Sequence, residues 1–279
     1  MSPKTVVITG AGSGIGRAMA LTWADRGCTV GVSDYNAEGA ARTVELIESA
    51  GGSADSFCCD VRSEEDLEAM AAHFFERWGR VDVLVNNAGV IDAGTVGEVA
   101  MEDWRRVMGT CFWGAVHGCH AFIPRMKRQG GGHIVNVASI AGIISLPEAA
   151  PYNTAKAAVV SLSETLRSEL APHRIGVTVV CPSILQTNLL EGMTVTDEWE
   201  NDFIRSAFAN SRMGADRIAE KVVAAVDSNR LFVFPQSAAK LARALMRLCP
   251  RTFYALLALL YRSRLRRPAF MWLARRGLT

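Results

Sequence analysis

The sequence lacks the residue patterns that hold metal ions or build a disulfide framework. Its seven cysteines form no Cys-x-x-Cys pair, and the adjacent Cys58 and Cys59 suit neither a mutual disulfide nor a tetrahedral zinc site. Five histidines are scattered, and no Glu or Cys accompanies the i,i+3 pair His117 and His120. We therefore expect no metal centre, and free thiols in a reducing cytoplasm are the simplest interpretation.

Long apolar runs and a secretory signal are also missing. The opening stretch MSPKTVVITG leads directly into a strand-like segment, without the charged start and apolar core of an export signal. The longest apolar run of the C-terminal tail, residues 253–261, has nine residues. A membrane-spanning helix needs roughly 20. These absences favour a cytoplasmic protein.

Acidic side chains are absent from residues 240–279, which contain ten Lys and Arg. The first 239 residues hold the other 20 basic side chains and all 28 acidic ones, a net charge of −8. Apolar side chains beside arginines are typical of an interfacial helix on anionic lipid. They are equally typical of a helix that packs on the acidic body or on a neighbouring subunit. The high apolar content disfavours nucleic acid as a partner.

Short β-branched segments alternate with helical patterns along residues 1–239. Strands are expected at 5–10, 28–34, 56–61, 81–89, 132–139, 175–182 and 231–234, and helices at 18–26, 38–50, 64–78, 101–127, 152–171 and 215–226. Nearly continuous apolar strands separated by helices predict a parallel sheet covered on both faces, a doubly wound α/β fold. No linker or repeat interrupts residues 1–239, so we expect one domain followed by a basic, helical tail at 240–279.

The glycine-rich stretch TGAGSGIG, residues 9–16, lies between the first expected strand and the first helix. Glycines let the backbone approach a pyrophosphate, whose charge is met by free N–H groups at the helix start. The predicted binding residues of this turn are Gly10, Ser13, Gly14, Ile15 and Gly16. Asp34 ends the second strand where a carboxylate binds the adenosine ribose and repels a 2′-phosphate, which favours NAD over NADP. Arg17 is expected to be solvated.

Ser139, Tyr152 and Lys156 form a second constellation. Tyr152 and Lys156 are i,i+4 on one expected helix and share a face, while Ser139 ends the preceding strand. A phenol with an ordinary pKa near 10 is a poor acid–base group at neutral pH. A nearby ammonium and a cationic nicotinamide would both lower that pKa. Each residue alone has an ordinary structural role, so only the combination with the nucleotide turn indicates catalysis.

These motifs resemble the short-chain dehydrogenase/reductase family. The resemblance covers residues 4 to about 235 and rests on TGAGSGIG (9–16), CCDV (58–61), NNAG (86–89), Ser139, YNTAK (152–156) and CPSILQT (181–187). It implies a Rossmann-like fold and hydride transfer between a nicotinamide and an alcohol or ketone. It also implies that Tyr152 is the acid–base, that Lys156 lowers its pKa and binds the nicotinamide ribose, and that Ser139 bonds the substrate oxygen. Further implied cofactor contacts are Asp60, Val61, Asn87, Leu185 and Thr187.

The main departure from the family pattern is Cys111. Trp104 and Gly114 match a pattern in which Asn stands at the position of Cys111. The resemblance implies that this Asn lies at a helix kink and holds a water molecule that links the lysine to solvent. A thiol is a weak donor and a weak acceptor. Nothing local supplies a base, so we expect Cys111 to be a small apolar filler rather than a nucleophile.

Residues 188–214 occupy the place of the family's substrate loop. Large apolar side chains are frequent in it: Leu189, Leu190, Met193, Trp199, Phe203 and Phe208. They either pack this lid on the body or contact a bulky apolar substrate of steroid, retinoid or lipid type. The leading expectation is a NAD-dependent alcohol dehydrogenase or ketone reductase, as a homodimer or homotetramer. The alternative is a nucleotide-binding sensor or scaffold with weak turnover, because Cys111 replaces the relay Asn.

Overall fold

One parallel sheet organises the protein. The computed structural model describes residues 4–184, 193–195, 197–211, 213–263 and 266–276. Within these residues seven strands pair in the order β3-β2-β1-β4-β5-β6-β7, and every pair is parallel. The strands are β1 (Thr5–Thr9), β2 (Thr29–Asp34), β3 (Ser53–Cys58), β4 (Val83–Asn86), β5 (Gly132–Val137), β6 (Ile175–Val180) and β7 (Phe232–Val233). The predicted doubly wound fold is confirmed, and the strand order reverses between β1 and β4, where such folds bind ligands.

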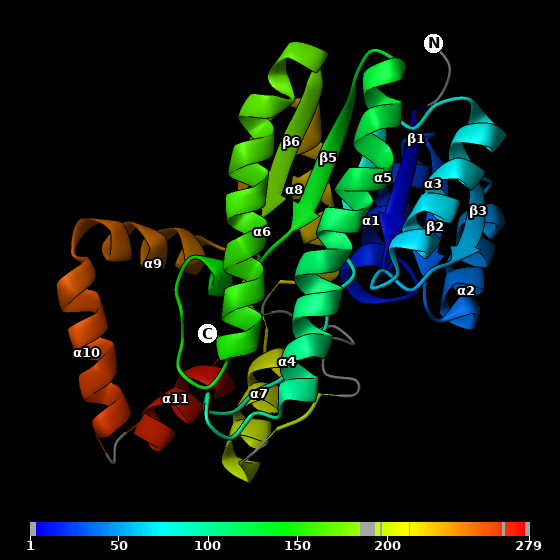
Figure 1. Cartoon of the computed structure of the whole chain (residues 1–279). Coiled ribbons are helices and arrows are strands. Elements are labelled where there is room, and N and C mark those ends of the chain that lie inside the picture. The colour runs from blue at the N-terminus through cyan, green and yellow to red at the C-terminus, as the bar shows by residue number, and fades with distance from the viewer. Residues whose placement is uncertain (1–3, 185–192, 196, 212, 264–265, 277–279) are drawn as a thin grey trace.

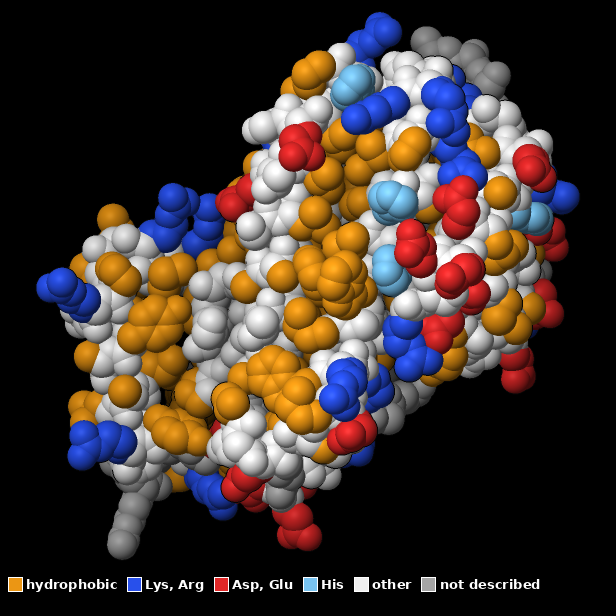
Figure 2. All heavy atoms as spheres, viewed as in Figure 1, with side chains coloured by type: hydrophobic (Ala, Val, Ile, Leu, Met, Phe, Trp, Pro, Cys, Tyr) orange, Lys and Arg blue, Asp and Glu red, His pale blue; other side chains and the backbone are white. Residues whose placement is uncertain are grey.

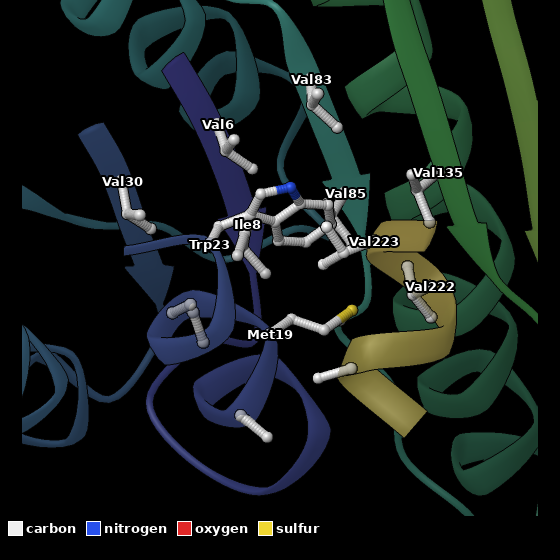
Figure 3. Close-up of a cluster of buried hydrophobic side chains, with 14 of the residues drawn as sticks. Val6, Ile8, Met19, Trp23, Val30, Val83, Val85, Val135, Val222 and Val223 are labelled. Atoms are coloured by element: carbon white, nitrogen blue, oxygen red, sulfur yellow. The ribbon is translucent and has the colours of Figure 1, made fainter. Parts of the chain in front are cut away.

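Helices cover both faces of the sheet (Figure 1). One face carries α1 (Gly14–Asp25), α2 (Ala37–Ser49) and α8 (Ala215–Asp227). The other carries α3 (Glu64–Trp78), α5 (Gly114–Arg128) and α6 (Ala150–Glu169). Because successive strand residues point to opposite faces, Val6 and Ile8 of β1 pack under α1 and α8, whereas Val7 belongs to the opposite cluster. Trp23 and Val223 meet Val6 and Ile8 in this core (Figure 3), which holds the last turn of α1 and helix α8 against β1.

Local signals explain the bounds of α3, whereas other helices depart from the expected bounds. α3 begins and ends at the predicted residues, because Ser63 accepts a hydrogen bond from the Asp66 N–H at 3.0 Å and Gly79 ends the helix with φ of 75°. α1 begins at Gly14, earlier than the expected residue 18. The helix expected at 101–127 is divided into α4 (Met101–Met108), a π turn (Gly109–Trp113) and α5. The inserted residue of such a turn bends a helix locally.

The C-terminal residues form three helices beyond the sheet, α9 (Ser237–Leu248), α10 (Pro250–Arg262) and α11 (Arg266–Arg275). α11 packs on α7 (Glu198–Ala209), where the Phe203 and Phe270 rings meet edge to face at 6.0 Å. Arg267 pairs with Asp197 and lies 5.2 Å from the ring centre of Trp199. The end of the tail therefore covers the lid helix of its own chain. Among the described helices, none is both long and apolar enough to cross a membrane.

Candidate active site

The turn between β1 and α1 has the shape of an anion cradle. Gly10 and Gly14 adopt left-handed backbone conformations, with φ of 64° and 53°. A Cβ atom at Gly16 would lie 2.0 Å from the Gly10 carbonyl oxygen, so a side chain is excluded there. Ser13 precedes α1 without a side-chain cap, which leaves the N–H groups of the first turn available to a phosphate. Ile15, the remaining predicted residue of the turn, packs against the core.

Asp34 is buried at the end of β2 and ties the glycine turn to this strand. Its Oδ2 accepts from the Gly12 N–H at 2.9 Å and its Oδ1 from the Asn36 N–H at 3.0 Å. Arg17 is half-buried and hydrogen-bonded, whereas the sequence expectation was a solvated side chain. Its guanidinium donates to Thr43 Oγ1 at 3.0 Å and to the Gly12 carbonyl. The packing of α2 beside α1 brings Thr43 to it, which the periodicity of α1 alone does not reveal.

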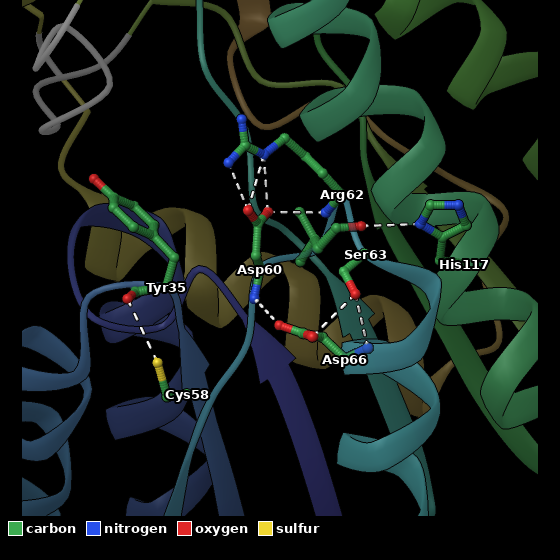
Figure 4. A network of polar contacts seen from close by, with 8 residues as sticks. Tyr35, Cys58, Asp60, Arg62, Ser63, Asp66 and His117 are labelled. Atoms are coloured by element: carbon green, nitrogen blue, oxygen red, sulfur yellow. Dashed lines mark hydrogen bonds and ion pairs between the residues drawn. The ribbon is translucent and has the colours of Figure 1, made fainter.

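The loop after β3 holds Asp60 in a network of polar contacts (Figure 4) and buries Val61. The Asp60 carboxylate accepts from the Arg62 backbone N–H and from its Nε, each at 3.0 Å. These bonds hold the pKa of Asp60 below its ordinary value, so its carboxylate is ionised at neutral pH. Val61 is buried beneath α5, where a Cβ at Gly114 would lie 2.8 Å from its Cγ2. The Val61 carbonyl oxygen lies 3.0 Å from His117 Nδ1.

Asn87 braces the glycine turn from the end of β4. Its Nδ2 donates to the carbonyl oxygens of Thr9 and Gly10 at 2.9 and 3.0 Å. Thr9 Oγ1 in turn accepts from the N–H groups of Asn87 and Ala88. Sequence reasoning missed this bracing role of Thr9, although Thr9 is the first residue of the glycine motif. The two remaining predicted cofactor contacts, Leu185 and Thr187, lie outside the described residues.

β5 and α6 bring Ser139, Tyr152 and Lys156 together at the carboxyl end of the sheet. Lys156 Nζ donates to the Val137 carbonyl oxygen at 2.8 Å and lies 5.6 Å from the centre of the Tyr152 ring. Ser139 Oγ accepts from the Ala141 N–H at 3.1 Å. All three members of the set are buried. A phenol, a hydroxyl and an ammonium thus converge in a site shielded from bulk water, an arrangement suited to proton transfer.

Burial raises the pKa of the Tyr152 phenol above its ordinary value. The neighbouring Cys111 thiol adds to this effect, while a hydrogen bond with Ser139 opposes it. The sequence predicts a lowered pKa for Tyr152 from Lys156 together with a bound, cationic nicotinamide. Lys156 alone does not offset the effect of burial on this pKa. At neutral pH the phenol of the protein itself is therefore protonated.

Cys111 lies in the π turn between α4 and α5. Its thiol is 3% exposed and packs with Tyr152 in a small cluster of buried side chains. The thiol donates to the Val90 carbonyl oxygen at 3.2 Å and accepts from the Val90 N–H at 3.4 Å. A Cβ at Gly89 would lie 3.4 Å from Lys156 Nζ and 3.5 Å from Cys111 Sγ, so the thiol and the ammonium flank the same glycine. Cys111 is more than an apolar filler, because it anchors the loop after β4.

A buried carboxylate, which the sequence did not point to, joins that loop to the lid. Asp92 is 1% exposed, pairs with Arg106 of α4, and accepts from the Thr194 N–H at 2.9 Å. The Ala93 N–H donates to the Thr194 carbonyl oxygen at 3.1 Å. Burial raises the pKa of Asp92, and its Oδ2 has no hydrogen-bond partner among the described residues. Asp92 thus holds the described start of the lid, residues 193–195, beside the catalytic set.

Comparison with known proteins identifies relatives of this chain. Residues 4–198 match a family model described as short chain dehydrogenase. "Putative oxidoreductase SadH" of Mycobacterium tuberculosis is 39% identical over 196 residues, which cover 70% of this chain and 71% of that protein. The 3beta-hydroxysteroid dehydrogenase of Mediterraneibacter gnavus is 37% identical over 193 residues, 67% of this chain and 68% of that protein. A crystal structure of a short chain dehydrogenase/reductase from Burkholderia phymatum in complex with NAD has a TM-score of 0.84 at 32% identity, and the match covers 88% of this chain and 94% of that chain.

Proposed function

The chain belongs to the short-chain dehydrogenase/reductase family, and we propose that it transfers a hydride between NAD and the hydroxyl or carbonyl group of a bulky apolar substrate of steroid, retinoid or lipid type. Oxidoreductase activity of the alcohol dehydrogenase or ketoreductase kind follows from the family. The choice of NAD over NADP, the residue roles and the substrate class are the proposal. The observation that carries it is the convergence of Ser139, Tyr152 and Lys156 beside the glycine turn.

The residues of this chain fit a dinucleotide. The left-handed glycines and the uncapped start of α1 suit a pyrophosphate, and Asp34 at the adjacent strand end would repel a 2′-phosphate. We assign the remaining cofactor contacts to Asp60, Val61 and Asn87, and to Leu185 and Thr187 of the segment outside the described residues. When bound, the nicotinamide supplies or accepts the hydride.

In the proposed reaction Tyr152 exchanges a proton with the substrate oxygen. For ketone reduction the protonated phenol donates to the carbonyl oxygen, and its raised pKa keeps that proton available at neutral pH. For alcohol oxidation the phenolate must form, and the Lys156 ammonium 5.6 Å from the ring centre reduces the energy needed to form it. In the same proposal, a hydrogen bond between Ser139 Oγ and the substrate oxygen orients that oxygen.

An apolar substrate is supported by the side chains around Tyr152. Val90, Ile91, Met108 and Phe112 are partly buried and pack against the cluster that contains this phenol. The lid offers fewer apolar side chains to a substrate than its composition suggests. The Trp199 and Phe203 rings stack on each other, with their centres 5.5 Å apart, and contact α11 instead. The similar 3beta-hydroxysteroid dehydrogenase acts, by its name, on a steroid hydroxyl, which supports the same substrate class for this chain.

We place this activity in a cytoplasmic homodimer or homotetramer. Contact of residues 240–279 with a membrane surface belongs to the same proposal, because an apolar substrate partitions into lipid. The second candidate, a sensor or scaffold with weak turnover, is favoured only by Cys111 in place of the relay Asn. The bonds between Cys111 and Val90 weaken that alternative, because the thiol still anchors the site.

Replacement of Tyr152 by Phe tests the proposed reaction. The substitution removes the proton donor but keeps the ring, so turnover of a hydrophobic alcohol such as a 3-hydroxysteroid should fall at least about 10³-fold. NADH affinity, measured by fluorescence titration, should remain. Undiminished turnover in this variant rules out Tyr152 as the acid–base, and native protein that binds NADH but turns over none of a panel of apolar alcohols favours the sensor.

A further inference from the structure

α10 is an apolar helix that the protein does not cover. None of its residues is buried, and Leu256 and Leu259 are 55% and 63% exposed. A groove of about 730 Å³ separates it from the start of α6, and the Tyr261 hydroxyl donates across this groove to Glu148 at 2.7 Å. A helix that is apolar all round is ordinarily enclosed by protein or lipid. Something outside the described residues of this chain therefore covers α10.

α9 carries a second uncovered apolar stripe. Leu241, Leu245 and Leu248 follow one another at i, i+4 and i+7, and all three are exposed, Leu248 by 79%. Its neighbour Ala239 is buried, so the helix is anchored on one side while its leucines point elsewhere. We call α9 and α10 together the C-terminal arm. In Figure 2 the arm, at the left, shows hydrophobic and basic side chains, while the acidic ones lie on the rest of the molecule, many of them at the right of the view.

A cationic pocket of about 460 Å³ lies where the arm leaves the sheet. Four basic residues line it: Lys221, Arg230, Lys240 and Arg243. The Arg243 guanidinium lies 4.9 and 4.7 Å from the ring centres of Phe232 and Phe234, which fixes the floor of the pocket. None of the four pairs with a carboxylate of the described residues. Four uncompensated cations in one hollow favour an anion with several oxygen acceptors, such as a phosphate ester.

We infer that the C-terminal arm docks on an anionic lipid bilayer and that the phosphate headgroup of a lipid occupies the cationic pocket. Leucines beside arginines, with no acidic residue from 240 onward, match the apolar interior and negative surface of such a bilayer. A second copy is a poorer occupant, because a two-fold contact between arms would bring two acid-free surfaces together. This inference deepens the proposed membrane contact and does not depend on turnover.

Vesicle flotation at 0.15 M salt tests the docking. The full chain is mixed with vesicles of phosphatidylcholine alone or of phosphatidylcholine with 30% phosphatidylglycerol. It should float with the anionic vesicles and far less with the neutral ones. Size-exclusion chromatography with light scattering, run without lipid, shows whether the arm instead joins two copies.

Two double variants test separately the cationic pocket and the exposed leucines of the arm. Lys221→Gln with Arg230→Gln should weaken binding to anionic vesicles about 25-fold, at about fivefold for each charge near the membrane. The charge-matched control is Lys127→Gln with Arg128→Gln, at the C-terminal end of α5 and outside both the arm and the pocket lining, and it should bind like the native chain. Leu245→Ser with Leu256→Ser should abolish flotation, whereas Met101→Ser, an equally exposed apolar position on α4, should not. NADH binding and thermal stability report that each variant is folded.

Four outcomes overturn the inference in whole or in part. Failure of the native chain to float removes the docking, even if it turns over apolar alcohols. A dimer that dissociates in the leucine variant, without flotation, assigns the arm to a second copy. Stabilisation by inorganic phosphate or glycerol phosphate, lost in the pocket variant and without flotation, assigns the pocket to a soluble anion. Flotation of the pocket variant equal to that of the native chain removes the headgroup site.

Discussion

The Cys111 thiol is hydrogen-bonded to both the carbonyl oxygen and the N–H of Val90. The contact spans 21 positions of sequence and joins the π turn to the loop after β4, near Lys156 and Tyr152. The two bonds to Val90 require a side chain that has one donor and one acceptor. An amide provides a stronger donor and a stronger acceptor than a thiol. Cys111 therefore anchors the loop after β4 in this chain.

Cys111→Asn should leave kcat within about threefold of the native value, because the amide can make the same two bonds to Val90. Cys111→Ala should lower the free energy of unfolding by about 1 kcal/mol, because it leaves the Val90 groups without partners. Steady-state kinetics and urea denaturation measure the two effects. A tenfold or larger gain for the Asn variant shows that the native relay is impaired, as the sensor alternative requires.

Asp34→Ala should relax the cofactor preference. The native chain should bind NADH at least about tenfold more tightly than NADPH, because the Asp34 carboxylate would repel the 2′-phosphate. Its loss should bring the two dissociation constants close together, with some loss of stability since Gly12 and Asn36 lose their acceptor. Asp25→Ala, at the exposed end of α1, is the matched control and should keep the native ratio. Equal affinities in the native chain contradict the assignment of NAD.

The sequence predicted the local parts of this site better than its long-range contacts. Tyr152 and Lys156 could be found because i,i+4 spacing on a helix brings side chains together whatever surrounds them. The contact of Arg17 was missed, because its partner Thr43 comes from another helix whose position the periodicity does not give. The Asp92–Arg106 pair was missed for the same reason, since it joins two loops and a helix. The fold itself was predictable because continuous apolar strands and intervening helices restrict the topology to few alternatives.

Asp92→Asn should impair substrate binding more than chemistry. The substitution keeps an acceptor for the Thr194 N–H but removes the charge that pairs with Arg106, so the start of the lid loses part of its anchor. We expect KM for the alcohol to rise about tenfold with kcat within about threefold, because Tyr152 and Lys156 are untouched. Glu102→Gln is the control, since that carboxylate is 81% exposed and pairs with Arg105 of its own helix. An equal KM in the two variants would show that Asp92 has no special positioning role.

His133 should make the protein sensitive to mild acid. The side chain is 7% exposed on β5, and its Nε2 lies 2.8 Å from Thr178 Oγ1. The Thr178 hydroxyl donates its hydrogen to the Arg230 carbonyl oxygen, so towards His133 it can only accept, from Nε2–H. The neutral imidazole ring provides this donor. Burial, with a smaller contribution from Arg167, lowers the pKa of His133 to about 4.

Because this folded-state pKa lies below the unfolded value of about 6.5, the unfolded chain binds the proton first. The contribution of neutral, buried His133 to the free energy of unfolding is fully present above about pH 6.5. It is lost as the pH falls towards about 4, and the loss reaches up to about 3 kcal/mol. Urea unfolding at pH 7.5, 5.5 and 4.5 measures this loss. His133→Gln keeps a donor towards Thr178 but cannot titrate, so its stability should be lower at pH 7.5 and should fall less steeply with acid. Parallel pH profiles for the two proteins assign the acid sensitivity to other groups.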